Sequence, residues 1–219
     1  MQLVSLCLRP TFHFTVTALL FLLCFSCAKS PIGSTLEINV PLSTSQPIDY
    51  RAAVWNQVSD SEAWTETALR EIRTHRSEFE MARDKSDFCP GYETANERNR
   101  DICWLRLVSA VVKFESGFNP RDRFREASGI WSVGLLALSA HECANAPTSE
   151  SLTNPHKNLV CGIAMMANLI AKDGFIDGPA TSRGAASYWS TLRAPYVSRH
   201  LHVGKKRGVM NYTRQYLDY

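Results

Sequence analysis

The sequence lacks an excess of either charge, internal repeats and low-complexity segments. Charged residues make up 21% of its 219 positions and the formal net charge is only +3, which argues against a strongly basic nucleic-acid-binding protein. We therefore expect no nucleic acid among its partners. Hydrophobic residues make up 45% of the chain, enough for one well-packed domain and not for two.

A hydrophobic run long enough to cross a membrane is also missing. The apolar run at residues 14–26 (FTVTALLFLLCFS) is too short to span a bilayer and has the composition of a secretory h-region. Ser26 and Ala28 are small enough for cleavage after Ala28, so we expect residues 1–28 to be a signal peptide and the protein to be secreted or periplasmic. In the alternative, Cys27 is lipidated and anchors an outer-membrane lipoprotein, and only then is a membrane a partner.

Metal-ligating patterns are scarce as well. Outside residues 1–28 no CxxC or HxxxH motif occurs, so we expect neither a metal nor a cofactor. The same region holds four cysteines, an even number that predicts two disulfides in an exported chain. Three pairings can be drawn, and we favour the one that closes two modest loops between predicted helices, Cys143 with Cys161 and Cys89 with Cys103.

Proline, glycine, serine and threonine are frequent in residues 29–49, so we expect a linker or an extended arm there, followed by one domain over residues 50–219. The domain is predicted to be mainly α, because apolar residues recur in it at helical spacing. Residues 118–139 lack that spacing and predict a small irregular or β element. The predicted helices lie within residues 50–83, starting near Ser61, and then from Thr94 or Asn96 to Glu115, from Asn154-Pro155 to Asp173-Gly174, and over residues 184–192.

Glu115 is the most informative single residue. It stands at the end of a predicted helix, in register with the apolar side chains Val108 and Val111, so its charge would be costly to bury. We expect the carboxyl group to retain its proton near neutral pH, which is what general-acid catalysis requires. Gly117 and Pro120 then end the helix, which places Glu115 where a helix meets a loop.

Four motifs together resemble those of the lysozyme-like lytic transglycosylases, the soluble-lytic-transglycosylase domain that is akin to goose-type lysozyme. They occur in the order and approximate spacing of that family and span about residues 95–195. The resemblance implies a mostly helical lysozyme-like fold, with a small β element beside the catalytic cleft, that cleaves the β-1,4 bond between N-acetylmuramic acid and N-acetylglucosamine in peptidoglycan. The motifs are residues 115–120 (ESGFNP), 132–136 (SVGLL), Asn158-Leu159 with Gly162, and 186–188 (ASY).

The resemblance also implies roles for individual residues. Glu115 matches the catalytic acid/base of the family, Ser116 its supporting hydroxyl and Tyr188 the aromatic residue near the catalytic carboxyl group. The implied partner is a peptidoglycan glycan strand, and we expect the protein to be a monomer. The residues that would line the sugar-binding site are Ser132, Gly134, Leu135, Leu136 and Ala137.

Two positions depart from the family pattern. Ala137 stands where the family usually has a glutamine that helps to hold the acetamido side of the sugar. The alanine at this position either indicates a modified substrate, such as de-N-acetylated peptidoglycan, or is a tolerated change. Trp189 follows Tyr188 where asparagine is usual, and we interpret it as a packing residue in preference to a sugar platform.

Glycoside hydrolases commonly use a second carboxylate, and Glu126 is our better candidate for it. Asp122 is the other acidic residue that is close in sequence. The alternative role of Glu126 is that of an ion-pair partner for Arg123 or Arg125.

Three functions remain open on this basis. The first is a peptidoglycan glycosidase, either a lytic transglycosylase or a lysozyme-type hydrolase. The second is a glycan-binding module that does not cut its ligand. The third is a disulfide-linked envelope protein in which Glu115 is a buried structural acid.

We expect the basic C-terminal stretch to be a solvated face, with attraction to anionic envelope polymers as the alternative. Its basic residues are Arg193, Arg199, Lys205, Lys206, Arg207 and Arg214.

Overall fold

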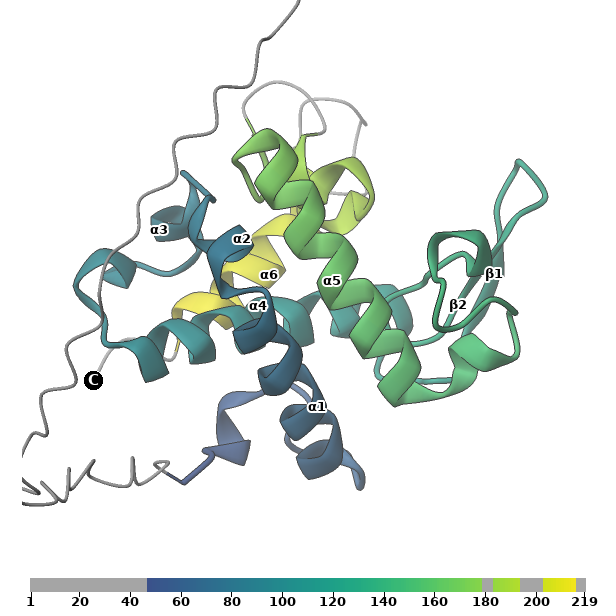
Figure 1. The fold of residues 1–219 in the computed structure, drawn as a ribbon, viewed down its shortest axis with the longest axis horizontal. Coiled ribbons are helices and arrows are strands. Elements are labelled where there is room, and N and C mark those ends of the chain that lie inside the picture. The colour runs from purple at the N-terminus through teal and green to yellow at the C-terminus, as the bar shows by residue number, and fades with distance from the viewer. Residues whose placement is uncertain (1–46, 179–182, 194–202, 216–219) are drawn as a thin grey trace, which may run out of the picture. The chain divides into compact units, whose positions relative to one another are not determined.

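The computed structural model describes residues 47–178, 183–193 and 203–215. The predicted signal peptide, Cys27 and nearly all of the predicted linker lie outside the described residues, so they stay predictions. Gln46–Tyr219 form one compact unit. Its described part is mainly α-helical with one two-stranded sheet, which confirms the predicted fold class (Figure 1).

Helices and strands follow one another along the chain with short connections, and several connections contain single turns of 3-10 helix. The α-helices and strands are α1 (Ser61–Thr74), α2 (Arg76–Glu80), α3 (Lys85–Phe88), α4 (Glu97–Ser116), β1 (Arg123–Arg125), β2 (Trp131–Val133), α5 (Pro155–Asp173) and α6 (Val203–Arg214). The 3-10 turns are η1 (Tyr50–Ala52), η2 (Tyr92–Thr94), η3 (Ala140–Glu142), η4 (Ser151–Thr153), η5 (Gly184–Ser187) and η6 (Ser190–Leu192).

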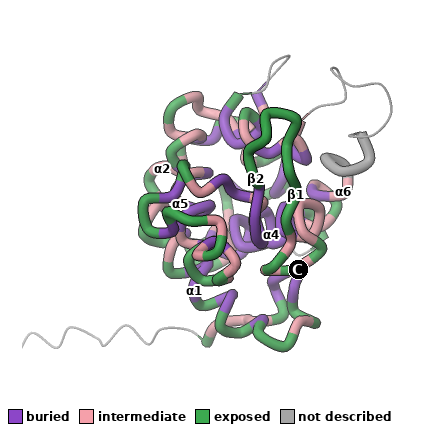
Figure 2. The backbone as a smooth tube through the Cα atoms, turned by 90° about the vertical axis from the view of Figure 1, so that its right-hand side faces the viewer, coloured by how far each residue is buried: buried purple, intermediate pink, exposed green. Residues whose placement is uncertain are grey.

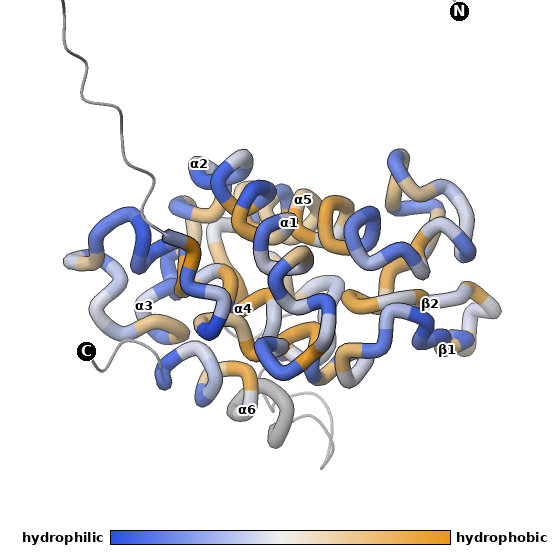
Figure 3. The backbone as a smooth tube through the Cα atoms, turned by 90° about the horizontal axis from the view of Figure 1, so that it is seen from below, coloured by the Kyte–Doolittle hydropathy of each residue, from blue (hydrophilic) through white to orange (hydrophobic). Residues whose placement is uncertain are grey.

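Helix α4 is the centre of the core. The side chain of Asn96 caps its first turn by accepting a hydrogen bond of 2.9 Å from the backbone N–H of Asn99, and Gly117 ends it in a left-handed conformation. Every residue from 101 to 112 is buried, because α1 and α6 pack against this helix. Figure 3 shows hydrophobic residues along α4 and α5, and mostly hydrophilic ones in β1.

Helix α5 begins and ends where the sequence predicts. Asn154 accepts a hydrogen bond of 3.1 Å from the backbone N–H of Lys157, Pro155 occupies the first turn, and Gly174 ends the helix at a φ of 75°. One face of α5 packs against α1 and η5. The predicted helix over residues 184–192 is wrong in type. Two 3-10 turns flank Tyr188 and Trp189, whose side chains instead bond to the loop after β2.

Helix α6 was not predicted, and the interpretation of the C-terminal stretch as only a solvated face is wrong for part of it. Val209 and Thr213 are fully buried, and Gly208 lies so close to Phe114 of α4 that a Cβ atom there would be 2.3 Å from the ring. The buried guanidinium of Arg106 in α4 donates hydrogen bonds of 2.7 Å to two carbonyls, that of Tyr212 in α6 and that of Ala52 in η1. Arg199, and the side chains of Lys205, Lys206 and Arg207, lie outside the described residues.

Strands β1 and β2 form an antiparallel hairpin in which Arg123 pairs with Val133, Phe124 with Ser132, and Arg125 with Trp131. This is the small β element predicted within residues 118–139. Figure 2 shows β1 exposed along its length, whereas β2 runs from an exposed to a buried end.

Both favoured disulfides, Cys89–Cys103 and Cys143–Cys161, are present. Such bonds are typical of exported proteins. None of the helices in the described ranges is long and apolar enough to cross a membrane.

Candidate active site

Glu115 lies in the last turn of α4 and is half-buried. Its carboxylate oxygen Oε1 accepts a hydrogen bond of 2.7 Å from the hydroxyl of Thr191, a fully buried residue of η6. A hydrogen bond from a buried, fixed donor restricts the rotation of the carboxylate. The side chain is therefore held in one orientation at the helix end.

Ser116 joins the end of α4 to the loop that follows β2. Its hydroxyl lies 2.9 Å from the carbonyl oxygen of Leu135 and 3.2 Å from that of Val112, so it bonds to backbone and not to the neighbouring carboxylate. Ser116 therefore holds this loop against the helix that carries Glu115, and the role that the resemblance implies for its hydroxyl stays a prediction.

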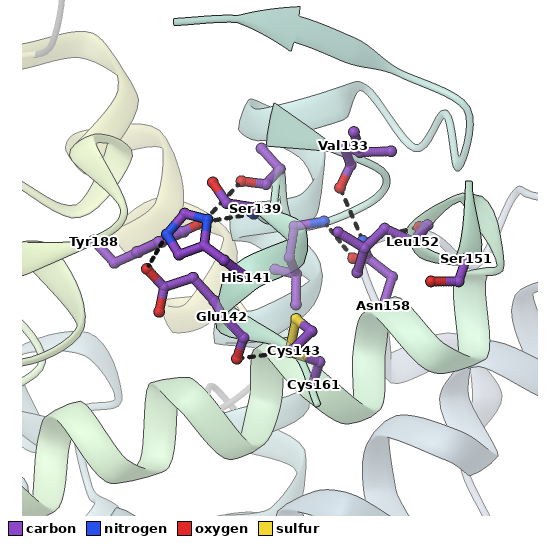
Figure 4. Close-up of a disulfide and its surroundings, with 12 residues drawn as sticks. Val133, Ser139, His141, Glu142, Cys143, Ser151, Leu152, Asn158, Cys161 and Tyr188 are labelled. Atoms are coloured by element: carbon purple, nitrogen blue, oxygen red, sulfur yellow. Dashed lines mark hydrogen bonds and ion pairs between the residues drawn. A yellow bond between two sulfur atoms is a disulfide. The ribbon is translucent and has the colours of Figure 1, made fainter. Parts of the chain in front are cut away.

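Residues 134–139 form this loop after β2, which we call the β2 loop. Asn158 of α5 is buried and ties this region to η4 with three hydrogen bonds (Figure 4): its Oδ1 accepts from the N–H of Leu136, and its Nδ2 donates to the carbonyls of Val133 at the end of β2 and of Leu152 in η4. Gly134 has a φ of 79°, and a Cβ atom there would lie 2.4 Å from both Asn158 and the Leu152 carbonyl. Only glycine fits this position.

Leu135 and Leu136 are fully buried, so the structure places their side chains in the core and not on a ligand-facing surface. The indole N–H of Trp189 donates a hydrogen bond of 2.9 Å to the carbonyl of Leu136. Trp189 is itself buried, which confirms its interpretation as a packing residue. The two buried leucines and the bond from Trp189 therefore anchor the β2 loop to the core.

Tyr188 is half-buried against the same loop. Its hydroxyl accepts a hydrogen bond of 3.1 Å from the N–H of Ser139 and donates one of 3.4 Å to the carbonyl of Ala137. Burial is the main reason that the pKa of Tyr188 lies above its ordinary value, with smaller contributions from the nearby carboxylates of Glu142 and Glu126. The side chain is therefore a neutral phenol at physiological pH, oriented by the backbone of the β2 loop (Figure 4).

Glu126 lies directly after β1 and is exposed. The buried hydroxyl of Ser132 donates a hydrogen bond of 2.6 Å to its Oε1 across the hairpin. The ion-paired role that we considered for Glu126 is not observed among the described contacts, because Arg123 pairs with Glu150 and Arg125 donates to the carbonyl of Gly129.

The structure thus brings most of the predicted site residues together around one loop.

No group of three or more histidine, cysteine, aspartate or glutamate side chains suited to a metal occurs within the described ranges. His141 instead pairs with Glu142 at 3.1 Å, and His156 lies 2.8 Å from the hydroxyl of Thr67.

Sequence reasoning missed Thr191 and Ser139. Thr191 follows three residues after Tyr188, within the segment next to the last family-like motif, and that closeness is the signal that could have indicated it. Ser139 bonds through its backbone N–H, for which side-chain identity carries no signal.

No family model and no curated protein matches the chain. Solved structures of the Bdellovibrio protein Bd0314 DslA do match it at 26% identity, over 76% of this chain and 96% of that one. The TM-score is 0.63 for the wild-type protein (form 2), and 0.64 and 0.62 for two variants in which a glutamate is replaced by glutamine. The two replaced glutamates are eleven positions apart, as Glu115 and Glu126 are in this chain.

Proposed function

We propose that the chain is an exported peptidoglycan glycosidase that cleaves the β-1,4 bond between N-acetylmuramic acid and N-acetylglucosamine, with Glu115 as general acid and Glu126 as the second carboxylate. The pair of glutamates carries the proposal. They have the same spacing as the two glutamates that were replaced by glutamine in Bd0314 DslA, a protein similar in fold over nearly its whole length. Such a replacement preserves size and removes the acid function.

The surroundings of Glu115 suit a proton donor. The side chain is half-buried at a helix end, and the hydroxyl of Thr191 orients its carboxylate, as is required of a group that must deliver a proton to a glycosidic oxygen. In the reaction, the C1–O bond breaks as Glu115 protonates the departing oxygen, and an oxocarbenium-like state forms at C1.

The surroundings of Glu126 suit a base. Its carboxylate is exposed to solvent and is oriented by the hydroxyl of Ser132. In our proposal it takes a proton from a water molecule whose oxygen attacks C1, which gives a reducing end. A lytic transglycosylase needs only Glu115, which would then activate the sugar's own 6-hydroxyl and leave a 1,6-anhydro end. The presence of a positioned second carboxylate favours hydrolysis.

Ala137 favours a second candidate, a hydrolase selective for de-N-acetylated peptidoglycan. Its methyl group offers no hydrogen bond to an acetamido group. The nearby hydroxyl of Tyr188 already bonds to the backbone of Ser139 and Ala137, so it does not replace the missing amide. A glycan that lacks the acetyl group loses nothing at such a position.

The test is product analysis on purified sacculi, in native form and after chemical de-N-acetylation, with the mature chain and its Glu115→Gln and Glu126→Gln variants. We expect the wild-type protein to release soluble fragments with reducing ends. Glu115→Gln should lower the rate by at least about 1,000-fold and Glu126→Gln by about 100-fold. Mass spectrometry separates reducing ends from anhydro ends, and the two sacculus preparations report on the acetyl group.

Glu62→Gln is the matched control, because Glu62 is an exposed glutamate in the first turn of α1. It should retain the wild-type rate. Full activity of Glu115→Gln would overturn the proposal. Anhydro ends with full activity of Glu126→Gln would assign a transglycosylase, and binding of sacculi without release of fragments would assign a glycan-binding module.

A further inference from the structure

The β1–β2 hairpin exposes large apolar side chains that the fold does not use. Among the described residues, four large hydrophobic side chains are exposed, and three of them lie on this hairpin: Phe124 (65%), Ile130 (41%) and Trp131 (45%). None of the three packs against the hydrophobic core. Exposed large apolar side chains that gather on one element outside the core are typical of a binding surface.

The register of the hairpin places part of this cluster beside the proposed site. Phe124 pairs with Ser132, and the N–H of Glu126 donates a hydrogen bond of 2.8 Å to the carbonyl of Ile130. Since side chains alternate between the two faces of a strand, these four residues share one face of the hairpin. The carboxylate of Glu126 therefore lies on the same face as the exposed ring of Phe124 and the side chain of Ile130. We call this the Phe124 face.

The other face of the hairpin has a different character. It carries Arg123, Arg125 and Trp131, and the guanidinium of Arg125 lies 5.9 Å from the centre of the Trp131 ring. Trp131 is therefore already covered in part by a cation within the molecule. Among the described residues, Phe124 makes no ring or cation contact, and its side chain is the most exposed of the three. The Phe124 face is therefore the one that is available to a ligand.

We propose that the Phe124 face is a platform for the glycan strand beyond the bond that is cut, with Phe124 stacking on the apolar face of a pyranose ring. This inference rests on the proposed function and extends it to a neighbouring sugar. The C–H groups of a pyranose face carry slight positive charge and meet the negative face of an aromatic ring favourably. Phe124 shares its face of the hairpin with Glu126, the proposed second carboxylate, and with Ser132. A glycan strand that reaches Glu126 would therefore also reach Phe124, which favours a glycan over a membrane as the ligand.

Charge supports the same occupant. Arg121, Arg123 and Arg125 are exposed on or next to β1, and the peptide stems of peptidoglycan carry carboxylates on alternate sugars. A strand that lies on the Phe124 face would bring these carboxylates near a cationic edge.

The test measures binding separately from cleavage, in full-length mature protein that carries Glu115→Gln so that the ligand survives. Binding to purified glycan strands of defined length is measured for Phe124→Ala, Phe124→Tyr and Phe124→Leu. We expect about a 5- to 10-fold weaker affinity for Phe124→Ala and Phe124→Leu, and near wild-type affinity for Phe124→Tyr, because stacking needs a ring. The loss should grow with strand length up to the length that reaches the hairpin.

Met81→Ala is the matched control, because Met81 is also a large exposed hydrophobic residue (53%) and directly follows α2, a helix that lies away from the hairpin in Figure 1. It should bind strands as well as the parent. Equal binding by Phe124→Ala and its parent overturns the platform, even if the wild-type protein cleaves sacculi. Failure of the wild-type protein to cleave, with Phe124-dependent strand binding intact, overturns the proposed function and leaves the platform standing. Phe124-dependent binding to vesicles of anionic phospholipid, with unchanged strand binding, assigns the face to a membrane and overturns the inference.

Discussion

The hydroxyl of Thr191 lies 2.7 Å from the carboxylate of Glu115, although the two residues are 76 positions apart in the sequence. Thr191 is fully buried and belongs to η6, which contacts both α4 and α6. The orientation of the proposed proton donor therefore depends on the packing of the C-terminal part of the domain and not only on its own helix.

The first prediction concerns this hydrogen bond. Thr191→Val keeps the shape of the side chain but removes the donor, so kcat/KM on sacculi should fall by about 10-fold, equivalent to about 1.4 kcal/mol of lost transition-state stabilisation. Thr191→Ser keeps a hydroxyl and should lose about 3-fold or less. Wild-type kcat/KM in Thr191→Val, with unchanged thermal stability, would show that the bond does not position Glu115.

The second prediction concerns Gly134. Gly134→Ala must place a Cβ atom 2.4 Å from the carbonyl of Leu152 and from Asn158, at a φ of 79°. We expect the free energy of unfolding to fall by about 3 kcal/mol or more, measured by chemical denaturation. Gly91→Ala has a similar φ of 82° but nothing within 4 Å of its Cβ, so it isolates backbone strain and should cost about 1 kcal/mol. Equal losses in the two variants would show that the β2 loop moves to make room.

The third prediction separates the two disulfides. Each closes a short loop, of 18 residues for Cys143–Cys161 and 14 for Cys89–Cys103, so removing either should cost about 3 kcal/mol of stability. Only the former ties the segment after Ser139 to α5. Paired replacement of Cys143 and Cys161 by alanine should therefore also lower activity at temperatures where the protein stays folded. The Cys89 and Cys103 pair should lower stability alone, and equal effects on activity would contradict this distinction.

The fourth prediction is a loss of stability at alkaline pH. The hydroxyl of Tyr92 donates to Glu80 at 2.8 Å and accepts from the indole N–H of Trp104 at 2.7 Å. Burial, and then the hydrogen bond to Glu80, raise the pKa of Tyr92 well above its ordinary value of 10.0. The unfolded chain ionises this tyrosine near pH 10 while the folded protein keeps it neutral. Its contribution to stability is therefore fully present below about pH 10 and is lost as the pH rises beyond that value.

Denaturant unfolding between about pH 8 and pH 11 checks this prediction in the wild-type protein and in Tyr92→Phe. The variant cannot ionise at this position, so its free energy of unfolding should fall less steeply above about pH 10. Near neutral pH it should be less stable by about 1 to 2 kcal/mol, because the indole N–H of Trp104 loses its acceptor. Parallel alkaline slopes for the two proteins would contradict the raised pKa of Tyr92.

The helix boundaries could be predicted from the sequence because capping is local. Asn96 and Asn154 each bond to a backbone N–H three residues ahead, and Gly117 and Gly174 adopt conformations that other residues rarely adopt. Information over three or four residues was enough to place these ends. The disulfide pairing was equally accessible, since both bonds join cysteines that are close in sequence.

Helix α6 could not be predicted in the same way. Its sequence is basic and only Val209 and Thr213 are shown to be fully buried, so its apolar stripe is weak. What stabilises it is the close approach of Gly208 to Phe114 and the bond from Arg106 to the carbonyl of Tyr212, and both partners lie far away in the chain. Long-range pairing of this kind leaves little local pattern.

In the proposed site, too, the residues with a local sequence signal could be predicted, and those that depend on long-range contacts could not. Glu115 could be proposed because it begins a motif that resembles a family motif, and Glu126 because it is one of two carboxylates that follow closely in the sequence. The role of Ser132 as the partner of Glu126 depends on the register of the hairpin, and that of Thr191 on a contact between segments far apart. Leu135 and Leu136 match the family pattern, but the reason is the packing of the β2 loop, which the sequence alone did not separate from contact with a ligand.

A single guanidinium, that of Arg106, bonds to backbone at both extremities of the folded region, at Ala52 and at Tyr212. Removing either end of the folded region removes one of these two carbonyl acceptors. The Arg106 side chain is then less firmly fixed and binds the remaining end less well, so shortening one end also destabilises the other. Recombinant fragments of this domain should be designed with both ends intact, and a protease that nicks the chain before α6 would loosen the N-terminal turn as well.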